Sequence, residues 1–253
     1  MKSGLKSRGF TIVEVLIFLA VSSALMVSAF ALISGSQNKA SFTQSINDVQ
    51  QQMDSVINNV ANGYYADSAS FQECTVDVNG TLIFSNSPTA VTKGTSSQCI
   101  FLGRFIAFTD GSDEYTVYNV AGRRQISGKD VTKMEDANPK IIPDSQQTYT
   151  LKNGLTFKGT PNALGFFNGL GESSGVSDQL NSGYQQASFY GFSYINGQPL
   201  PTDFATGFNS DKNPPAGYGL CFNSGTTNQS GVITIGGNGR TATSSLEIRG
   251  TQC

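Results

Sequence analysis

The hydrophobic positions of this 253-residue chain begin with one long apolar run close to the N-terminus. From Phe10 to Ile33, 19 of 24 residues are apolar, and the other five are Thr11, Glu14, Ser22, Ser23 and Ser28. A helix rises about 1.5 Å per residue, so this segment would cover about 36 Å and cross a hydrocarbon core of ~30 Å. The pattern therefore predicts a membrane-spanning helix.

Beyond Gly35 the chain becomes polar, but apolar residues recur with alternating gaps of four and three positions. These residues are Phe42, Ile46, Val49, Met53, Val56 and Val60. The spacing places them on one face of a helix, and Asn62-Gly63 is a typical helix end. We expect one helix from Phe10 to Asn62, whose second half packs on the chain's own globular domain. A free coiled-coil dimer is the alternative, but the repeat is short and lacks regular flanking charge pairs.

From Tyr64 onward, short β-like runs alternate with turn residues. Residues 99–108 and 115–120 flank Asp110-Gly111, which predicts a β-hairpin, and Asn153-Gly154 between residues 149–151 and 155–157 predicts a second one. Further strands are expected at 188–195, 218–222, 232–235 and 245–248. The polar stretch from Arg123 to Gln147 is expected to be a loop outside the core. One long helix followed by many strands predicts an α+β fold, with the helix on antiparallel sheet.

The composition is typical of an extracellular domain. Charged residues make up 13% of the chain, against about 25% in an average soluble domain, and there are 28 glycines. The four cysteines, Cys74, Cys99, Cys221 and Cys253, all follow the apolar run and indicate two disulfides with three possible pairings. Nearness in sequence favours Cys74–Cys99 and Cys221–Cys253. A zinc site is not indicated, because the chain has no CxxC spacing and no histidine.

Glu14 is the one charged residue of the apolar run, where a carboxylate costs about 3 kcal/mol on insertion scales. Ahead of the run, Met1 to Gly9 carries three basic residues and no acid, which is typical of a flank that stays in the cytoplasm. An ordinary secretory signal would be cut after Ala29-Phe30-Ala31, before Leu32. Glu14 disfavours this interpretation, because the central region of such a signal works by uninterrupted apolarity.

The second interpretation places the cleavage between Gly9 and Phe10 and leaves the apolar helix on the mature protein. The new amine of Phe10 on one chain would then pair with the Glu14 carboxylate of a neighbour inside the membrane. Each charge would be satisfied only once subunits associate. The cost of placing Glu14 in the membrane would then favour one alignment of neighbouring subunits during assembly. The leader holds three of the 16 basic residues, so its removal leaves a side-chain net charge of −5.

A basic leader, Gly9 before Phe10, Glu14 as fifth residue of the product and a long apolar run together resemble the class III signal of type IV prepilins and pseudopilins. The resemblance covers Arg8 to about Ile33. It implies cleavage after Gly9 and methylation of the Phe10 amine by a prepilin peptidase. The implied organisation is a cleaved leader (1–9), a membrane and filament-core helix (10–34), an amphipathic helix (35–62) and a β-rich extracellular head (63–253). Many pilins have a helix-breaking proline late in the run, whereas this chain has none before Pro88.

This resemblance implies a structural subunit, minor or large, of a type IV pilus-like filament. The implied partners are other pilin subunits, the prepilin peptidase, an inner-membrane assembly platform and, before assembly, the membrane itself. The chain would be a single-pass membrane protein with a cytoplasmic N-terminus and would later lie at the cell surface. The alternatives are a tip adhesin, a DNA-binding minor pilin and a pseudopilin of a type II secretion system. Residues 218–253 loosely resemble the heads of minor pseudopilins.

No motif indicates an enzyme or a cofactor, because the chain lacks histidine, a GxSxG motif and a P-loop. Asp110 to Glu114 offers oxygens to Ca²⁺, but a hairpin turn explains the same residues. Arginines suggest a DNA surface, which the mature charge of −5 argues against. They are Arg123, Arg124, Arg240 and Arg249.

Overall fold

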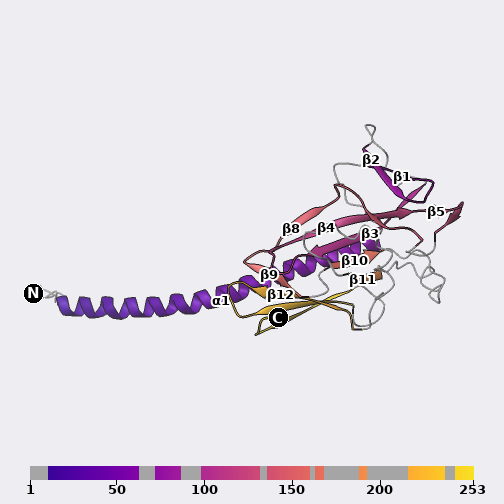
Figure 1. The fold of residues 1–253 in the computed structure, drawn as a ribbon. Coiled ribbons are helices and arrows are strands. Elements are labelled where there is room, and N and C mark those ends of the chain that lie inside the picture. The colour runs from indigo at the N-terminus through magenta and orange to yellow at the C-terminus, as the bar shows by residue number, and fades with distance from the viewer. Residues whose placement is uncertain are drawn as a thin grey trace, which may run out of the picture.

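A single helix of 50 residues, α1 (Ile12–Ala61), leads into a β-rich head (Figure 1). The computed structural model describes residues 11–62, 72–86, 98–131, 136–159, 163–167, 188–192, 216–236 and 243–253. The first part of α1 projects away from the head, and the second part lies against the strands. The N–H of Asn62 donates to the Asn58 carbonyl at 3.0 Å and ends the helix. The expected continuous helix is confirmed from Ile12 to Ala61.

In its described residues, the head is built from two antiparallel sheets and two small hairpins. The larger sheet has the order β11-β10-β3-β4, with β7 and β8 both pairing with the remaining side of β4, and the smaller one has the order β14-β13-β12-β9. Strands β1 and β2 form one hairpin and β5 and β6 the other. The bounds are β1 (Gln72–Val76), β2 (Leu82–Asn86), β3 (Cys99–Phe108), β4 (Glu114–Arg123), β5 (Gln125–Ile126), β6 (Lys129–Asp130), β7 (Lys140–Ile141), β8 (Gln147–Thr150), β9 (Leu155–Lys158), β10 (Ala163–Phe167), β11 (Ser188–Phe192), β12 (Tyr218–Ser224), β13 (Ser230–Ile235) and β14 (Ser244–Arg249). The predicted α+β class is confirmed.

The main core lies between the second half of α1 and both sheets. The six residues of the predicted helical stripe are all buried, together with Ile57. They belong to one cluster with residues of β3, β4, β9, β10, β12 and β13. Inside it, the ring of Phe108 stacks on Phe157 at 4.6 Å, and Phe222 meets both rings edge-on. Each fully buried apolar side chain contributes about 1.5–3 kcal/mol, so this stripe fixes the helix to the head.

Helix and sheet approach closely at Gly231 of β13. A Cβ atom at this position would lie 2.7 Å from Cγ1 of Ile46 and 3.1 Å from its Cδ1. Ile46 is fully buried, so the space above the glycine is filled by a helix side chain. The absence of a side chain at Gly231 therefore lets α1 sit against β13.

The first predicted hairpin is confirmed and the second is wrong. Strands β3 and β4 pair across the turn at Asp110-Gly111. At Asn153-Gly154 the chain does turn, with φ of 55° and 69°, but β8 pairs with β4 whereas β9 pairs with β12. The turn residues specify the local reversal, and the two flanking strands go to different sheets because each has a longer-range partner.

The expectation that Arg123 to Gln147 lies outside the core is also wrong in part. Ala137, Ile142 and Ser145 are buried, and β7 pairs with β4. The Ser145 hydroxyl donates to the Ile142 carbonyl at 2.6 Å and accepts from the Asn119 N–H at 3.1 Å. A polar side chain can occupy a buried position when both of its hydrogen bonds are made, which a polar sequence does not reveal.

Candidate functional site at the exposed half of the helix

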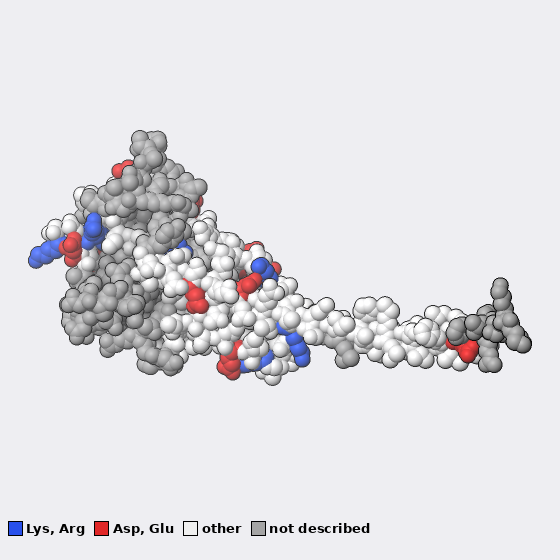
Figure 2. Space-filling model, turned by 180° about the vertical axis from the view of Figure 1, so that it is seen from behind, with Lys and Arg blue, Asp and Glu red and all other residues white. Residues whose placement is uncertain are grey.

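The first half of α1 exposes a continuous apolar surface. Among its described side chains between Ile12 and Ile33, the large hydrophobic ones range from 47% exposed at Val15 to 80% at Ile12. Between Glu14 and Lys39 the sequence has no charged residue, and Figure 2 shows this part of the helix as an uncharged rod with acidic atoms near its outer end. By length and composition the helix can cross a membrane.

Three serine hydroxyl groups on or next to this surface are satisfied within the helix. Ser23, Ser28 and Ser34 donate to the carbonyls four residues earlier at 2.7, 2.9 and 2.8 Å. Such bonds remove free donors from a surface that has no water to solvate them in lipid. These serines therefore leave the surface of the helix largely apolar, because their hydroxyl donors are bound to backbone carbonyls of the same helix.

Glu14 has a partner within its own chain. The N-cap residue Thr11 has extended backbone angles (φ −75°, ψ 150°), and its hydroxyl accepts from the Glu14 N–H at 3.3 Å. In return, Oε2 of Glu14 accepts from the Thr11 N–H at 3.0 Å and from its hydroxyl at 3.2 Å. This is a capping box, which satisfies donors at the start of the helix. The carboxylate therefore has hydrogen-bond donors within its own chain, whereas the neutralisation of its charge by an amine of a neighbour is not tested by these contacts.

The apolar pattern does not reveal this role of Thr11, whereas the spacing Thr11-x-x-Glu14 is a recognisable capping box. Both hydrogen bonds that Thr11 donates to the carboxylate end on Oε2, so among the described residues Oε1 has no donor and can accept one. Gly9 and Phe10 lie outside the described residues, so the cleavage site and the pairing of the Phe10 amine stay predictions.

Polar contacts fix the point where α1 leaves the head. Asn153, at the turn between β8 and β9, donates to the Ser45 hydroxyl at 2.7 Å and to the Ser41 carbonyl at 3.3 Å. One turn along the helix, Lys152 pairs with Asp48 at 3.1 Å. These contacts begin close to Phe42, the first buried position of the stripe. The exposed first half of α1 therefore ends where the turn at Asn153 binds the helix.

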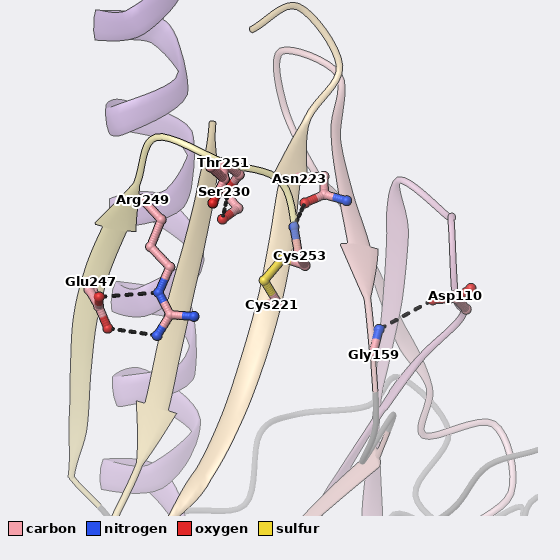
Figure 3. The surroundings of a disulfide bond; sticks show 9 residues. All are labelled: Asp110, Gly159, Cys221, Asn223, Ser230, Glu247, Arg249, Thr251 and Cys253. Atoms are coloured by element: carbon pink, nitrogen blue, oxygen red, sulfur yellow. Dashed lines mark hydrogen bonds and ion pairs between the residues drawn. A yellow bond between two sulfur atoms is a disulfide. The ribbon is translucent and has the colours of Figure 1, made fainter. Parts of the chain in front are cut away.

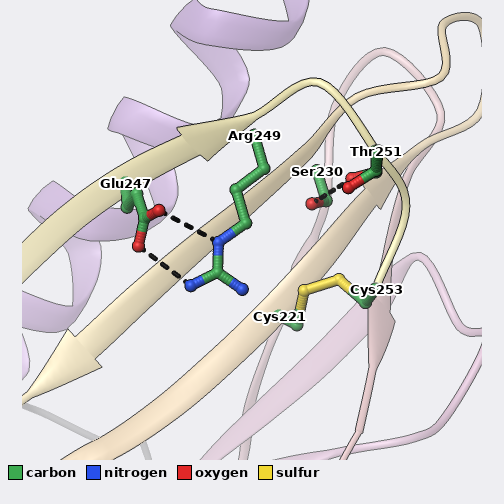
Figure 4. Close-up of polar contacts among 6 residues, drawn as sticks. All are labelled: Cys221, Ser230, Glu247, Arg249, Thr251 and Cys253. Carbon is green, nitrogen blue, oxygen red and sulfur yellow. Dashed lines mark hydrogen bonds and ion pairs between the residues drawn. A yellow bond between two sulfur atoms is a disulfide. The ribbon is translucent and has the colours of Figure 1, made fainter.

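The two disulfides have the pairing that sequence nearness favoured. One joins Cys74 of β1 to Cys99 of β3, and the other joins Cys221 of β12 to Cys253 (Figure 3). After β14 the chain crosses β13 to reach β12 (Figure 4). On the way, the Thr251 carbonyl accepts from the Ser230 hydroxyl at 2.6 Å. The last residues thus tie three strands together.

The remaining candidate sites are engaged in structural contacts. Asp110 accepts from Lys158 Nζ at 2.7 Å and from the Gly159 N–H at 3.2 Å, which together hold the pKa of its carboxyl below the ordinary value. Its oxygens thus already have donors, and no group of metal-ligating residues is found in the described parts of the chain. Arg123 donates to the carbonyl of Asp136 at 2.6 Å.

Of the other arginines considered for DNA, Arg249 makes two hydrogen bonds to Glu247, at 3.1 and 2.9 Å (Figure 4). Arg240 lies outside the described residues. Arg124 is exposed, and it makes no ion pair with a described residue. The described arginines therefore form no shared surface of free positive charge.

Comparison with known proteins gives one match. Residues 5–30 match the family model described as the prokaryotic N-terminal methylation motif. No curated protein and no solved structure matches the chain. The matched segment contains residues 5–9 of the predicted leader, the capping box and most of the exposed apolar surface of α1.

Proposed function

We propose that this chain, which its methylation motif places in the type IV pilin and pseudopilin family, is a structural subunit of a pilus-like filament. The observation that carries the proposal is the form of α1, a single unbroken helix that is apolar and exposed in one half and anchored to the head in the other. A surface of this size needs a partner in water, so lipid before assembly and neighbouring helices after assembly fit it.

The chain reaches this role by processing. A prepilin peptidase removes residues 1–9 and methylates the amine of Phe10, while the basic leader keeps the N-terminus in the cytoplasm. The subunit waits as a single-pass membrane protein with its head outside the cell membrane. An assembly platform then moves it into the filament, where its partners are other pilin subunits.

Glu14 has two roles in this scheme. Through Oε2 it caps α1 together with Thr11, which also compensates part of the cost of placing a carboxylate in lipid. Through Oε1 it receives the Phe10 amine of a neighbouring subunit. The capping contact holds the carboxylate in one orientation, so the incoming amine meets an acceptor that is already placed.

The head provides the outer surface of the filament, and its size favours a minor subunit or a large pilin. No contact among the described residues specifically favours a tip adhesin, a DNA-binding subunit or a secretion pseudopilin. Two of the four arginines that suggested DNA, Arg123 and Arg249, are held by the Asp136 carbonyl and by Glu247, which supports the structural role.

A pair of substitutions tests the proposal. Leu25→Gln places an amide on the exposed apolar helix, at a side chain that is 67% exposed, and should lower the share of subunit in filaments sheared from cells. Val78→Gln makes the same kind of change at a fully exposed hairpin tip and should leave this share unchanged. Membrane fractions of both strains control for insertion. Equal shares for wild type and Leu25→Gln would contradict assembly through this helix.

A further inference from the structure

A groove of about 480 Å³ lies between α1 and the edge of the larger sheet, on the part of the helix that is embedded in the head. The helix wall carries Asp48, Gln51, Gln52 and Ser55, and the sheet wall carries Tyr149 and Lys152. The apolar surface described above ends before this point. The groove therefore belongs to a different part of the molecule from the proposed assembly surface.

The groove has little net charge. Its one carboxylate, that of Asp48, pairs with its one ammonium, that of Lys152, at 3.1 Å. Both side chains remain partly exposed, at 39% and 72%. A strongly charged ligand would find one attractive and one repulsive group there, so a neutral ligand fits this lining better.

An aromatic ring faces the groove from the sheet. Tyr149 stacks on the buried Tyr115 with ring centroids 5.2 Å apart and an angle of 13° between the rings. Tyr115 is only 4% exposed, and it covers the face of the Tyr149 ring that stacks on it. The half-buried Tyr149 therefore lines the groove with the rest of its surface. The Tyr149 hydroxyl donates to Oε1 of Gln147 at 3.0 Å, which holds the ring in place.

The helix side of the groove presents groups that both donate and accept hydrogen bonds. Gln51, Gln52 and Ser55 are exposed, and their side chains make no hydrogen bond to a described residue. An amide offers one carbonyl acceptor and two N–H donors, and a hydroxyl offers both functions. Hydroxyl groups of a ligand need this mixture, since each of them donates and accepts.

From this arrangement we propose that the groove between α1 and β8 binds a neutral saccharide of one or two sugar units. The apolar face of a pyranose ring lies on the Tyr149 ring, and its hydroxyls bond to Gln51, Gln52 and Ser55. An aromatic platform with a few placed polar groups is the usual construction of a small-ligand site. This binding would give the head a recognition function in addition to its structural one, and it does not depend on filament assembly.

An extended peptide fits this groove less well. Only β8 offers a strand edge here, and it is four residues long. The next strand on the same side of β4, β7, is separated from it by a segment that contains Pro143 and the positive-φ residue Asp144. Short, interrupted edge strands are poor templates for strand addition.

The test uses the full chain in a zwitterionic detergent, since a detergent with a sugar head group would compete. Maltose, cellobiose, lactose and chitobiose are added at about 10 mM, which detects dissociation constants into the millimolar range, and saturation-transfer NMR reports binding. At least one disaccharide should receive saturation from the protein. Gln52→Ala should weaken its binding about three- to tenfold, as expected for one lost hydrogen bond.

Gln44→Ala is the matched control, because Gln44 is also exposed on α1 but does not line the groove. It should bind as wild type does, and circular dichroism of both variants checks that they are folded. The proposal is overturned if no disaccharide receives saturation, or if Gln52→Ala and wild type bind equally. It is also overturned if only an extended hexapeptide of alternating threonine and valine binds in a Gln52-sensitive way.

Discussion

Substitution of Glu14 separates its contribution to the helix start from its contribution to assembly. Glu14→Ala removes both the capping bond to Thr11 and the charge that meets the neighbour's amine. Glu14→Gln keeps an acceptor for the Thr11 N–H, because glutamine also serves in a capping box, but it removes the charge. Neither variant alters Gly9, so insertion and cleavage should continue in both.

The two contributions differ in size. Loss of a helix cap costs about 1 kcal/mol, and removal of the carboxylate also relieves about 3 kcal/mol of insertion cost, so the membrane form should not suffer. An α-amine is largely protonated at neutral pH, and leaving it unpaired in a water-excluded filament core costs about 3–5 kcal/mol. At about 1.4 kcal/mol per tenfold change, incorporation of Glu14→Ala should fall by a factor of about 10² to several times 10³.

The assay compares the filament-borne with the membrane-borne amount of each variant, measured by immunoblot after shearing. Glu14→Gln should lie between wild type and Glu14→Ala, since an amide accepts a hydrogen bond without neutralising the amine. Thr11→Ala serves as control because it removes the cap and keeps the carboxylate. It should assemble within about tenfold of wild type.

Assembly of Glu14→Ala at the wild-type level would refute this reasoning, because the carboxylate would then have no role beyond the cap. Equal defects in Thr11→Ala and Glu14→Ala would also refute it. In that case the helix start, and not the charge, would be what assembly requires.

Three further predictions concern the head and use urea or thermal unfolding of the detergent-solubilised chain. Gly231→Val should lower the free energy of unfolding by about 2 kcal/mol, because the new side chain displaces Ile46. Gly219→Val, with ordinary space around its Cβ, should lower it much less. Equal losses in the two variants would show that helix and sheet are not tightly packed at Gly231. Replacement of both cysteines of the C-terminal disulfide by serine should cost about 2–4 kcal/mol and speed hydrogen exchange in β14 more than in β3, and uniform acceleration would contradict a local tie. Asp110→Asn should lower the melting temperature at neutral pH, because bonds from Lys158 and from a backbone N–H depress the folded-state pKa of Asp110. Their stabilisation is present above the ordinary pKa of 3.8 and is lost as the pH falls through the folded-state pKa. A stability advantage of wild type over Asp110→Asn that persists far below pH 3.8 would contradict this.

The helix could be predicted from the sequence because its two halves have distinct and simple patterns. The first half is apolar all round, and the second repeats apolar residues on one face from Phe42 to Val60. Local periodicity reports directly on which face is buried. The strands with strong apolar alternation, such as β12, β13 and β14, were predicted for the same reason.

Pairing between distant segments could not be predicted in this way. Asn153-Gly154 specifies a turn, but nothing near it in sequence shows that β8 belongs beside β4 and β9 beside β12. Strands β1, β2 and β10 were not predicted. The groove likewise depends on side chains from residues 48–55 and 149–152, which only the folded chain brings together.

The N-terminal residue of the mature chain tests the central claim most directly. Membrane and filament material can be digested and its N-terminal peptide measured by mass spectrometry. Our account predicts a chain that begins at Phe10 and carries one methyl group on its amine. A mature chain that begins at Leu32 would contradict it, because the apolar helix would then be a removed secretory signal and not an assembly surface.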